Sequence, residues 1–264
     1  MFRVISLHSR QISTWALVIL IPALAIGLGS KPGVSYNHDK ISKGPWSIHI
    51  VKFNRSQRDL ELRTTLANDT VLGLSTLLDQ IRALPREAGS PLAALNGDFY
   101  VVEAKNPYLG DPRGLQILDG ELVSTPGDQA SFWLDTNGTP QATNVVSQLK
   151  LTWPDSSTTP IGLNEERRNG AAVLYTPRLG KSTRTQGGRE LILERAGDGP
   201  WLPLQAGLEY TARVREARAQ GDSPLAGGLL VLSLSPSLLT NAPAAAQAEA
   251  GAVLKISTAT VPDL

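Results

Sequence analysis

Short segments in which apolar residues alternate with polar ones, or run together, recur along most of this chain. Alternation is typical of β-strands, because successive side chains point to opposite faces of a sheet. Segments 46–51 and 60–66 both alternate, and we expect them to form a hairpin or adjacent strands. Segment 228–235 is apolar almost throughout, which predicts a buried strand. Further strands are expected at 91–95, 145–151, 171–176, 190–194, 208–215 and 253–257.

Two dipeptides predict tight hairpin turns between such strands. Asp119-Gly120 separates two short apolar runs within residues 114–124, and this dipeptide is a preferred two-residue hairpin turn. Asn137-Gly138 follows the run 131–136 in the same way. The sequence therefore predicts two consecutive hairpins in the middle of the chain.

One segment repeats its apolar residues at the period of a helix. Leucine or isoleucine stands at positions 74, 77, 78, 81 and 84, which places them on one face of a helix over residues 70–84. Thr70 or Ser75 is expected to cap its start, and Pro85 lies at its end. The alanine-rich segment 244–252 fits a short helix or a linker. Many strands and one clear helix predict an α+β fold that is mostly β, with mixed or antiparallel sheets and few helices.

The N-terminus has the pattern of an export signal. Arg3 and Arg10 precede the apolar run 15–28, which is shorter than the roughly 20 residues that span a membrane. Ala23 and Ala25 have the A-x-A spacing of a signal-peptidase site. We interpret residues 1–29 as a signal peptide, with an uncleaved membrane anchor as the alternative. Residues 30–44 are then a linker, and residues 45–264 form the globular domain.

Composition narrows the possible functions. The chain has 25 Lys and Arg residues against 24 Asp and Glu, so no broad basic surface for nucleic acid is expected. It has no cysteine, which excludes disulfides, thiolate nucleophiles and Cys-ligated metals. A cysteine-free chain with an export signal fits a secreted, periplasmic or cell-envelope protein of a bacterium. A membrane is expected as a partner only through an uncleaved leader.

Polar and aromatic side chains gather in two neighbouring loops. The run 96–100 (NGDFY) follows the predicted strand 91–95 directly, and Asp111 and Arg113 lie in the next turn-rich loop. Amide and carboxylate oxygens hold sugar hydroxyls, aromatic faces stack on sugar rings, and arginine binds phosphate with two hydrogen bonds. The alternative is ordinary turn chemistry, with Phe99 as a core residue.

At these residues the chain resembles the phosphodiester glycosidase family. The resemblance lies in segments 91–100 (PLAALNGDFY) and 110–124 (GDPRGLQILDGELVS), and a third similar segment covers residues 163–194. The order of these motifs extends the resemblance over about residues 45–258. Asp98 and Tyr100 stand where the family commonly has glycine and phenylalanine, so Asn96 and Gly97 are the closer matches.

The resemblance implies an exported enzyme that hydrolyses the glycosidic bond of a sugar phosphodiester, so that the partner is a carbohydrate or glycan phosphodiester. Asp98 and Asp111 are the candidate catalytic carboxylates, because glycosidic hydrolysis uses an acid and a carboxylate. The candidate substrate-binding residues are Asn96, Gly97, Tyr100 and Arg113. No metal and no cofactor is expected.

One expected part of the family pattern is missing from the sequence. An arginine-containing strand and a later Asp-Gly-Gly-Gly-Ser-Ser-like motif are expected toward the C-terminus, and the sequence shows neither. We therefore expect the domain to be C-terminally incomplete. The alternatives to an enzyme are a non-catalytic carbohydrate-binding or envelope module and an inactive truncated remnant.

Overall fold

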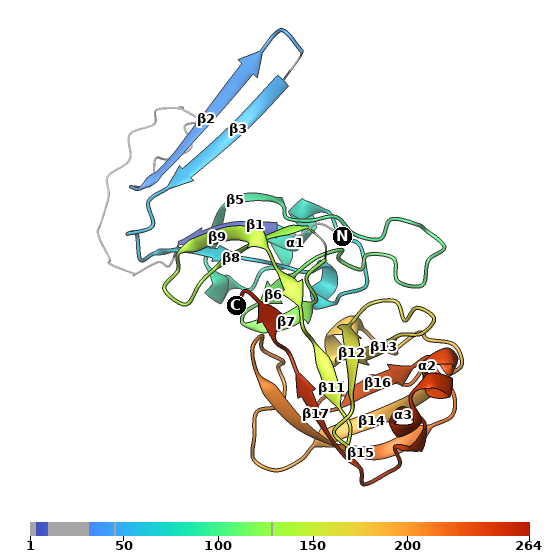
Figure 1. The fold of residues 1–264 in the computed structure, drawn as a ribbon. Helices are drawn as coiled ribbons and strands as arrows, with labels where there is room; N and C mark the ends of the chain where they lie inside the picture. The colour runs from blue at the N-terminus through green and yellow to red at the C-terminus, as the bar shows by residue number, and fades with distance from the viewer. Residues whose placement is uncertain (1–3, 10–31, 45, 128) are drawn as a thin grey trace.

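The computed structural model describes residues 4–9, 32–44, 46–127 and 129–264. Strands dominate these residues, and the α-helices within them are short: α1 (Leu77–Ala83), α2 (Pro236–Asn241) and α3 (Pro243–Gln247). The prediction of a mostly-β α+β fold with few helices is therefore confirmed. Figure 1 shows a barrel built from the C-terminal half, small sheets from the N-terminal half above it, and one hairpin that projects from them.

The C-terminal half forms a closed barrel of seven strands, in the order β11-β12-β13-β16-β14-β15-β17. Strands β12 and β13 are parallel, and the other neighbouring pairs are antiparallel. Closure leaves the barrel without an unpaired strand edge. The strands are β11 (Lys150–Thr152), β12 (Thr158–Leu163), β13 (Ala172–Tyr175), β14 (Arg189–Arg195), β15 (Glu209–Arg218), β16 (Leu230–Leu234) and β17 (Val253–Ser257).

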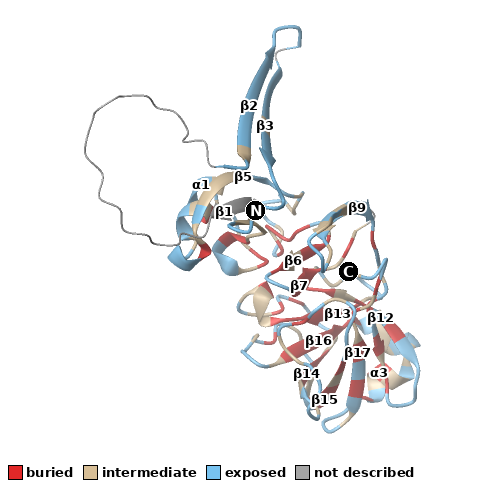
Figure 2. Cartoon of the chain, turned by 90° about the vertical axis from the view of Figure 1, so that its left-hand side faces the viewer, coloured by how far each residue is buried: buried red, intermediate tan, exposed pale blue. Residues whose placement is uncertain are grey.

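Two hydrophobic cores explain why some strands alternate apolar and polar residues while others are apolar throughout. The first fills the barrel and includes Leu174 and Leu232. The second lies on the outer face of β13, β14 and β16, where Tyr175 and Val231 pack against residues of the N-terminal half such as Tyr108. These three strands are therefore buried on both faces, as the apolar run 228–235 predicts. In Figure 2 the buried residues concentrate on the barrel strands and on β6 and β7.

The N-terminal half consists of small sheets. Strand β1 (Val4–Ser9) lies between β4 (Leu60–Arg63) and β5 (Ser90–Asn96) in an antiparallel sheet. The two-stranded sheets are β2 (Val34–Ile41) with β3 (Trp46–Phe53), β6 (Gln116–Leu118) with β7 (Glu121–Ser124), β8 (Ala130–Leu134) with β9 (Pro140–Asn144), and β10 (Val146–Ser147) with β18 (Thr260–Val261). Three 3-10 helices complete the described elements: Ala67–Asp69, Arg86–Ala88 and Pro177–Leu179.

The strand pairing differs from the prediction at the N-terminus. Strands β3 and β4 were expected to pair, but β3 pairs with β2 and β4 pairs with β1. The linker predicted over residues 30–44 is wrong for Val34–Ile41, which form β2. Its polar residues do not disfavour a strand here, because the hairpin is solvated on both sides. Of the leader predicted over residues 1–29, Val4–Ser9 form β1, and the apolar run and cleavage site lie outside the described residues.

The predicted helix over residues 70–84 is shorter than its periodicity suggests. Helix α1 begins only after Thr76, whose side-chain oxygen accepts a hydrogen bond of 3.1 Å from the backbone N–H of Asp79. Thr76 is therefore the N-cap, rather than Thr70 or Ser75. Glycine at position 73 has φ +147°, which no helix accommodates. The alanine-rich segment begins as helix α3, so the helical alternative is correct for its first residues.

The two predicted hairpins are present, with a two-residue turn in the first and a longer loop, residues 135–139, in the second. Asp119 and Gly120 have φ of 48° and 83°, the left-handed pair that a two-residue turn between β6 and β7 requires. Strands β8 and β9 are joined around Asn137-Gly138, and Gly138 has φ 72°. Local turn chemistry therefore determines this part of the chain.

Arg178 fastens the N-terminal half to the barrel. Its guanidinium donates to the Glu121 carboxylate on β7, with Nη2–Oε2 at 2.6 Å. Its Nη1 also lies 2.7 Å from Asp69 Oδ1 in the first 3-10 helix. The Glu121 side chain is only 9% exposed, so this contact is screened less than a surface ion pair. One arginine thus joins three segments that are far apart in the sequence.

The only fully shielded carboxylate among the described residues is Glu190, on β14. It accepts hydrogen bonds from the hydroxyls of Thr183, Thr185 and Ser233 and from the backbone N–H of Ser223, each at 2.7–2.8 Å. A buried carboxylate is tolerated where its oxygens are satisfied in this way. Glu190 therefore has a structural role, which fastens the loop before β14 to the barrel.

Candidate functional site

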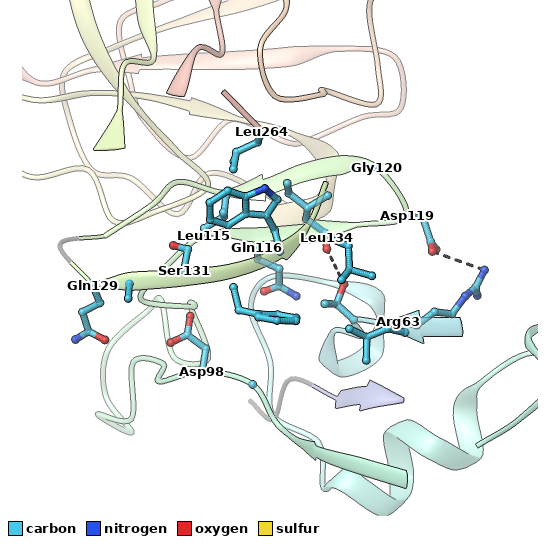
Figure 3. A pocket seen from close by; sticks show the side chains of 18 of the residues that line it. Arg63, Asp98, Leu115, Gln116, Asp119, Gly120, Gln129, Ser131, Leu134 and Leu264 are labelled. Carbon is cyan, nitrogen blue, oxygen red and sulfur yellow. Dashed lines mark hydrogen bonds and ion pairs between the residues drawn. The ribbon is translucent and has the colours of Figure 1, made fainter. Parts of the chain in front are cut away.

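A cavity of about 370 Å³ lies in the N-terminal half, between β4, the end of β5, the β6–β7 hairpin and β8. This volume lies in the range of small-molecule sites. Strand β8 and the β6–β7 hairpin form one wall, and the segment after β5 lies opposite (Figure 3). The lining residues are 61–64, 97, 98, 113–117, 119, 120, 129–134 and 264.

Backbone pairing after β5 brings the two predicted loops together at this cavity. The N–H of Arg113 donates to the carbonyl of Phe99 at 3.0 Å, and the N–H of Val101 donates to the carbonyl of Asp111 at 2.9 Å. Tyr100 and Pro112 form an isolated β-bridge between the same segments. Residues ten to fourteen positions apart in the sequence therefore lie side by side.

The approach of Asp98 to Gly114 depends on glycine. A Cβ atom on Gly114 would lie 2.8 Å from Asp98 Oδ2, which is closer than carbon and oxygen approach in proteins. Asp98 is half-buried, and its Oδ1 accepts a hydrogen bond of 2.7 Å from the backbone N–H of Phe99. The carboxylate is thus held at the cavity by the turn that follows β5.

Arg113, which precedes Gly114 in the sequence, adds a cation to the cavity lining. Its side chain is 57% exposed, and its Nη2 lies 3.9 Å from Glu103 Oε1. A long, exposed ion pair of this kind contributes little energy. The anionic group of a ligand can therefore replace Glu103 at the Arg113 guanidinium, provided that it accepts two hydrogen bonds.

The opposite end of the cavity carries an arginine that is already engaged. Arg63 Nε lies 3.0 Å from Glu61 Oε1, and its Nη2 lies 3.7 Å from Asp119 Oδ1. The hydrogen bond to Glu61, assisted by the charge of Asp119, raises the pKa of Arg63 above its ordinary value. In Figure 3 Arg63 and Asp119 lie far from Asp98, Gln129 and Ser131, which are at the other end of the cavity.

Apolar side chains line the cavity between its polar ends. Leu115, Leu134 and Leu264 are apolar lining residues, and Phe132 is 52% exposed. Trp133 also lines the cavity while it packs against the barrel core. An aromatic ring beside polar groups is the arrangement that binds the apolar face of a sugar ring and its hydroxyls together.

Three of the six predicted site residues line the cavity: Gly97, Asp98 and Arg113. Asn96 is exposed at the end of β5, where it pairs with Val4, and it is not among the lining residues. Tyr100 is half-buried against the second core. The structure brings these residues into one neighbourhood but gives only the first three direct access to the cavity.

Asp111, the second predicted carboxylate, does not line the cavity. Its side chain is buried, with 7% exposed, and its backbone takes part in the pairing with Val101. Phe99, expected as a core residue under the alternative of ordinary turn chemistry, is instead 72% exposed. The loop therefore turns one aromatic ring outward and one carboxylate inward, which residue types alone do not reveal.

Sequence reasoning missed most of the cavity wall. Gln129, Ser131 and Phe132 belong to β8 and its start, and Gln116 belongs to β6. The run 131–136 before the Asn137-Gly138 turn predicts a strand but gives no reason to place it beside Asp98. Only the pairing of distant segments identifies these residues.

The described residues contain no group of three or more His, Asp or Glu side chains placed to hold a metal ion. Within the same residues, none of the helices has both the length and the apolar character needed to cross a membrane.

The sequence matches no protein-family model and no curated protein. Solved structures do match its fold. One, described as a hypothetical protein from Synechocystis, aligns with a TM-score of 0.61 at 17% identity, over 87% of this chain and 40% of that one. Another, from Burkholderia pseudomallei and called "Putative exported protein", aligns with a TM-score of 0.55 at 20% identity, over 81% of this chain and 45% of that one. The chain thus shares a fold with both and spans less than half the length of either.

Proposed function

We propose that this chain is an exported phosphodiester glycosidase-like protein whose cavity binds a glycan phosphodiester. The observation that carries the proposal is that Asp98, Arg113 and Phe132 line one cavity, in which Gly114, the neighbour of Arg113, lies against Asp98. Export is supported by the leader-like pattern of residues 1–29 and by the description of the Burkholderia pseudomallei protein as exported.

Three kinds of contact hold the three parts of the proposed ligand: its phosphate, its sugar hydroxyls and its sugar ring. Arg113 binds the phosphate, because a guanidinium matches phosphate oxygens with two parallel hydrogen bonds. Asp98, Gln129 and Ser131 hold sugar hydroxyls, and Phe132 stacks on the ring. The Arg63 end binds no anion, since two carboxylates already surround its guanidinium.

Binding is better supported than hydrolysis by this cavity. Hydrolysis of a glycosidic bond uses two carboxyl groups on either side of the bond. Asp98 lies at one end of the cavity (Figure 3), whereas Glu61 and Asp119 are held by Arg63 at the other. Phosphate is already a good leaving group, so its departure needs only weak acid assistance in the hydrolysis that the family resemblance implies. The non-catalytic carbohydrate-binding module remains the second candidate function.

The binding step is tested by calorimetric titration of the full chain with the methyl diester of a hexose 1-phosphate. We expect saturable binding that Arg113→Gln weakens by roughly 10- to 100-fold, because a charge-assisted hydrogen bond contributes about 1.5–3 kcal/mol. Arg86→Gln is the matched control, since Arg86 is exposed and lies outside the cavity lining. No saturable binding by the unmodified chain would contradict the proposal.

The catalytic step is tested by release of free sugar from the same diester. We expect Asp98→Asn to abolish release and Asp111→Asn to leave it in proportion to the folded fraction. Binding without release by the unmodified chain selects the non-catalytic module instead. Equal loss in both variants with intact folding would contradict the assignment of Asp98.

A further inference from the structure

The β2–β3 hairpin stands away from the rest of the molecule. Each of its strands pairs only with the other among the described strands (Figure 1). Figure 2 shows almost the whole hairpin as exposed. At its base the two strands remain joined, since the N–H of Asn54 donates to the carbonyl of Gly33 at 2.7 Å. A lone two-stranded hairpin is marginally stable in water, so this one gains from a surface that covers it.

The end of the hairpin farthest from the body is apolar and aromatic. Ile41 and Trp46 are directly opposite each other in the register, and their side chains are 47% and 64% exposed. Ile48, two residues along the same face, is also exposed. The indole lies close over Gly44, where an added Cβ would be 2.6 Å from Nε1. Glycine at this position thus lets the ring lie over the tip.

Two lysines lie beside this apolar tip. Lys40 precedes Ile41 and Lys43 lies in the turn, while Lys52 is near the base and Asp39 is the only acidic residue of the hairpin. The rest of the chain carries nearly equal numbers of basic and acidic residues. The hairpin thus carries three lysines against one aspartate, and two of the lysines lie at the tip, beside Asp39.

We propose that the tip of the β2–β3 hairpin docks on an anionic membrane surface. Tryptophan favours the boundary between headgroups and hydrocarbon, and lysines beside it are attracted to anionic lipids. A second copy of the chain fits less well, since two hairpins would bring their lysines together. The proposal does not depend on the function of the cavity, whose residues lie outside the hairpin.

The cysteine-free sequence allows a direct test at one site. Ser42→Cys in the full chain, labelled with an environment-sensitive fluorophore, reports on the tip, and Gln220→Cys in an exposed barrel loop is the matched control. With phosphatidylglycerol-containing vesicles we expect a blue shift and rise in emission at position 42 only. Vesicles of phosphatidylcholine alone are expected to give much less. The predicted leader is present in every variant, so its contribution is constant.

The charge contribution is tested with the same label. Lys40→Gln combined with Lys43→Gln is expected to weaken partitioning roughly 30-fold, from about fivefold for each lysine near an anionic surface. Lys150→Gln with Lys181→Gln, both exposed on the barrel, is expected to leave it unchanged. The same signal at position 220, or none at position 42, overturns the proposal. A shift at position 42 without vesicles that grows with protein concentration overturns it in favour of self-association.

Discussion

Leu191 and Leu232 in the barrel are completely shielded from solvent, whereas Leu78 and Leu95 in the N-terminal half are more than half exposed. All four are leucines in regular secondary structure, so the difference lies in what surrounds them. The barrel closes on itself and surrounds a continuous core. The N-terminal half consists of small sheets with open edges and only one face to bury. The first region provides stability, and the second provides exposed surface and a cavity.

The two regions meet at the second core, to which both contribute buried side chains. The Tyr108 hydroxyl, from the loop before the cavity, lies 3.1 Å from the Tyr175 hydroxyl on β13 and donates to the carbonyl of Thr183. Arg178 reinforces the same contact with Glu121 and Asp69. The cavity loops are thus supported by the outer face of the barrel.

The largest effect is expected from the barrel core. Leu232→Ala removes a fully buried side chain, so we expect the free energy of unfolding to fall by about 2–5 kcal/mol. Leu78→Ala, on the exposed face of α1, is expected to change it by less than about 0.5 kcal/mol. Urea unfolding followed by circular dichroism measures both. Similar losses in the two variants would remove the contrast between the regions.

An intermediate effect is expected where the regions meet, and it depends on pH. Burial raises the pKa of Tyr108 to about 12 in the folded protein, whereas an unfolded tyrosine titrates near 10. The folded state therefore keeps the Tyr108 proton to a higher pH than the unfolded state does. The resulting stabilisation of the folded state is fully present below about pH 10 and is lost as the pH rises to about 12. The free energy of unfolding lost over this pH range is of the order of 3 kcal/mol, from about 1.4 kcal/mol for each pKa unit.

Urea unfolding at pH 8, 10 and 11 measures this loss. Tyr108→Phe is expected to be less stable than the unmodified chain at pH 8 but to lose less stability between pH 10 and 11. Tyr36→Phe, on the exposed hairpin, is the control and should follow the unmodified chain. A Tyr108→Phe protein with an unchanged pH dependence would show that this contact does not couple the regions.

The smallest effect is expected within the N-terminal half. Thr76→Ala removes the N-cap of α1 and is expected to lower the free energy of unfolding by about 1 kcal/mol. Thr76→Ser keeps the capping oxygen and is expected to restore most of it. Hydrogen exchange at the amide of Asp79 reports the cap locally. Equal protection in Thr76→Ala and the unmodified chain would place the start of the helix elsewhere.

Much of the fold follows from local patterns. The alternation over 208–215, the apolar run 228–235 and the Asp119-Gly120 turn all predict the elements that the structure contains. These features depend on neighbours within a few residues, through side-chain periodicity and backbone conformations that few residues adopt. The helix over 70–84 shows the limit of periodicity, because its spacing continues through Gly73 while the backbone does not.

The sequence by itself thus determined the strand-rich class, the hairpin turns and the polar loops that carry Asp98 and Arg113. Tertiary structure alone decided that Val4–Ser9 join β4 and β5, that Asp111 is buried outside the cavity lining and that Phe132 and Asp98 line the same cavity. The physical reason is that strand partners and cavity walls come from segments far apart in the chain. Their meeting depends on the packing of the whole fold, and no local pattern encodes it.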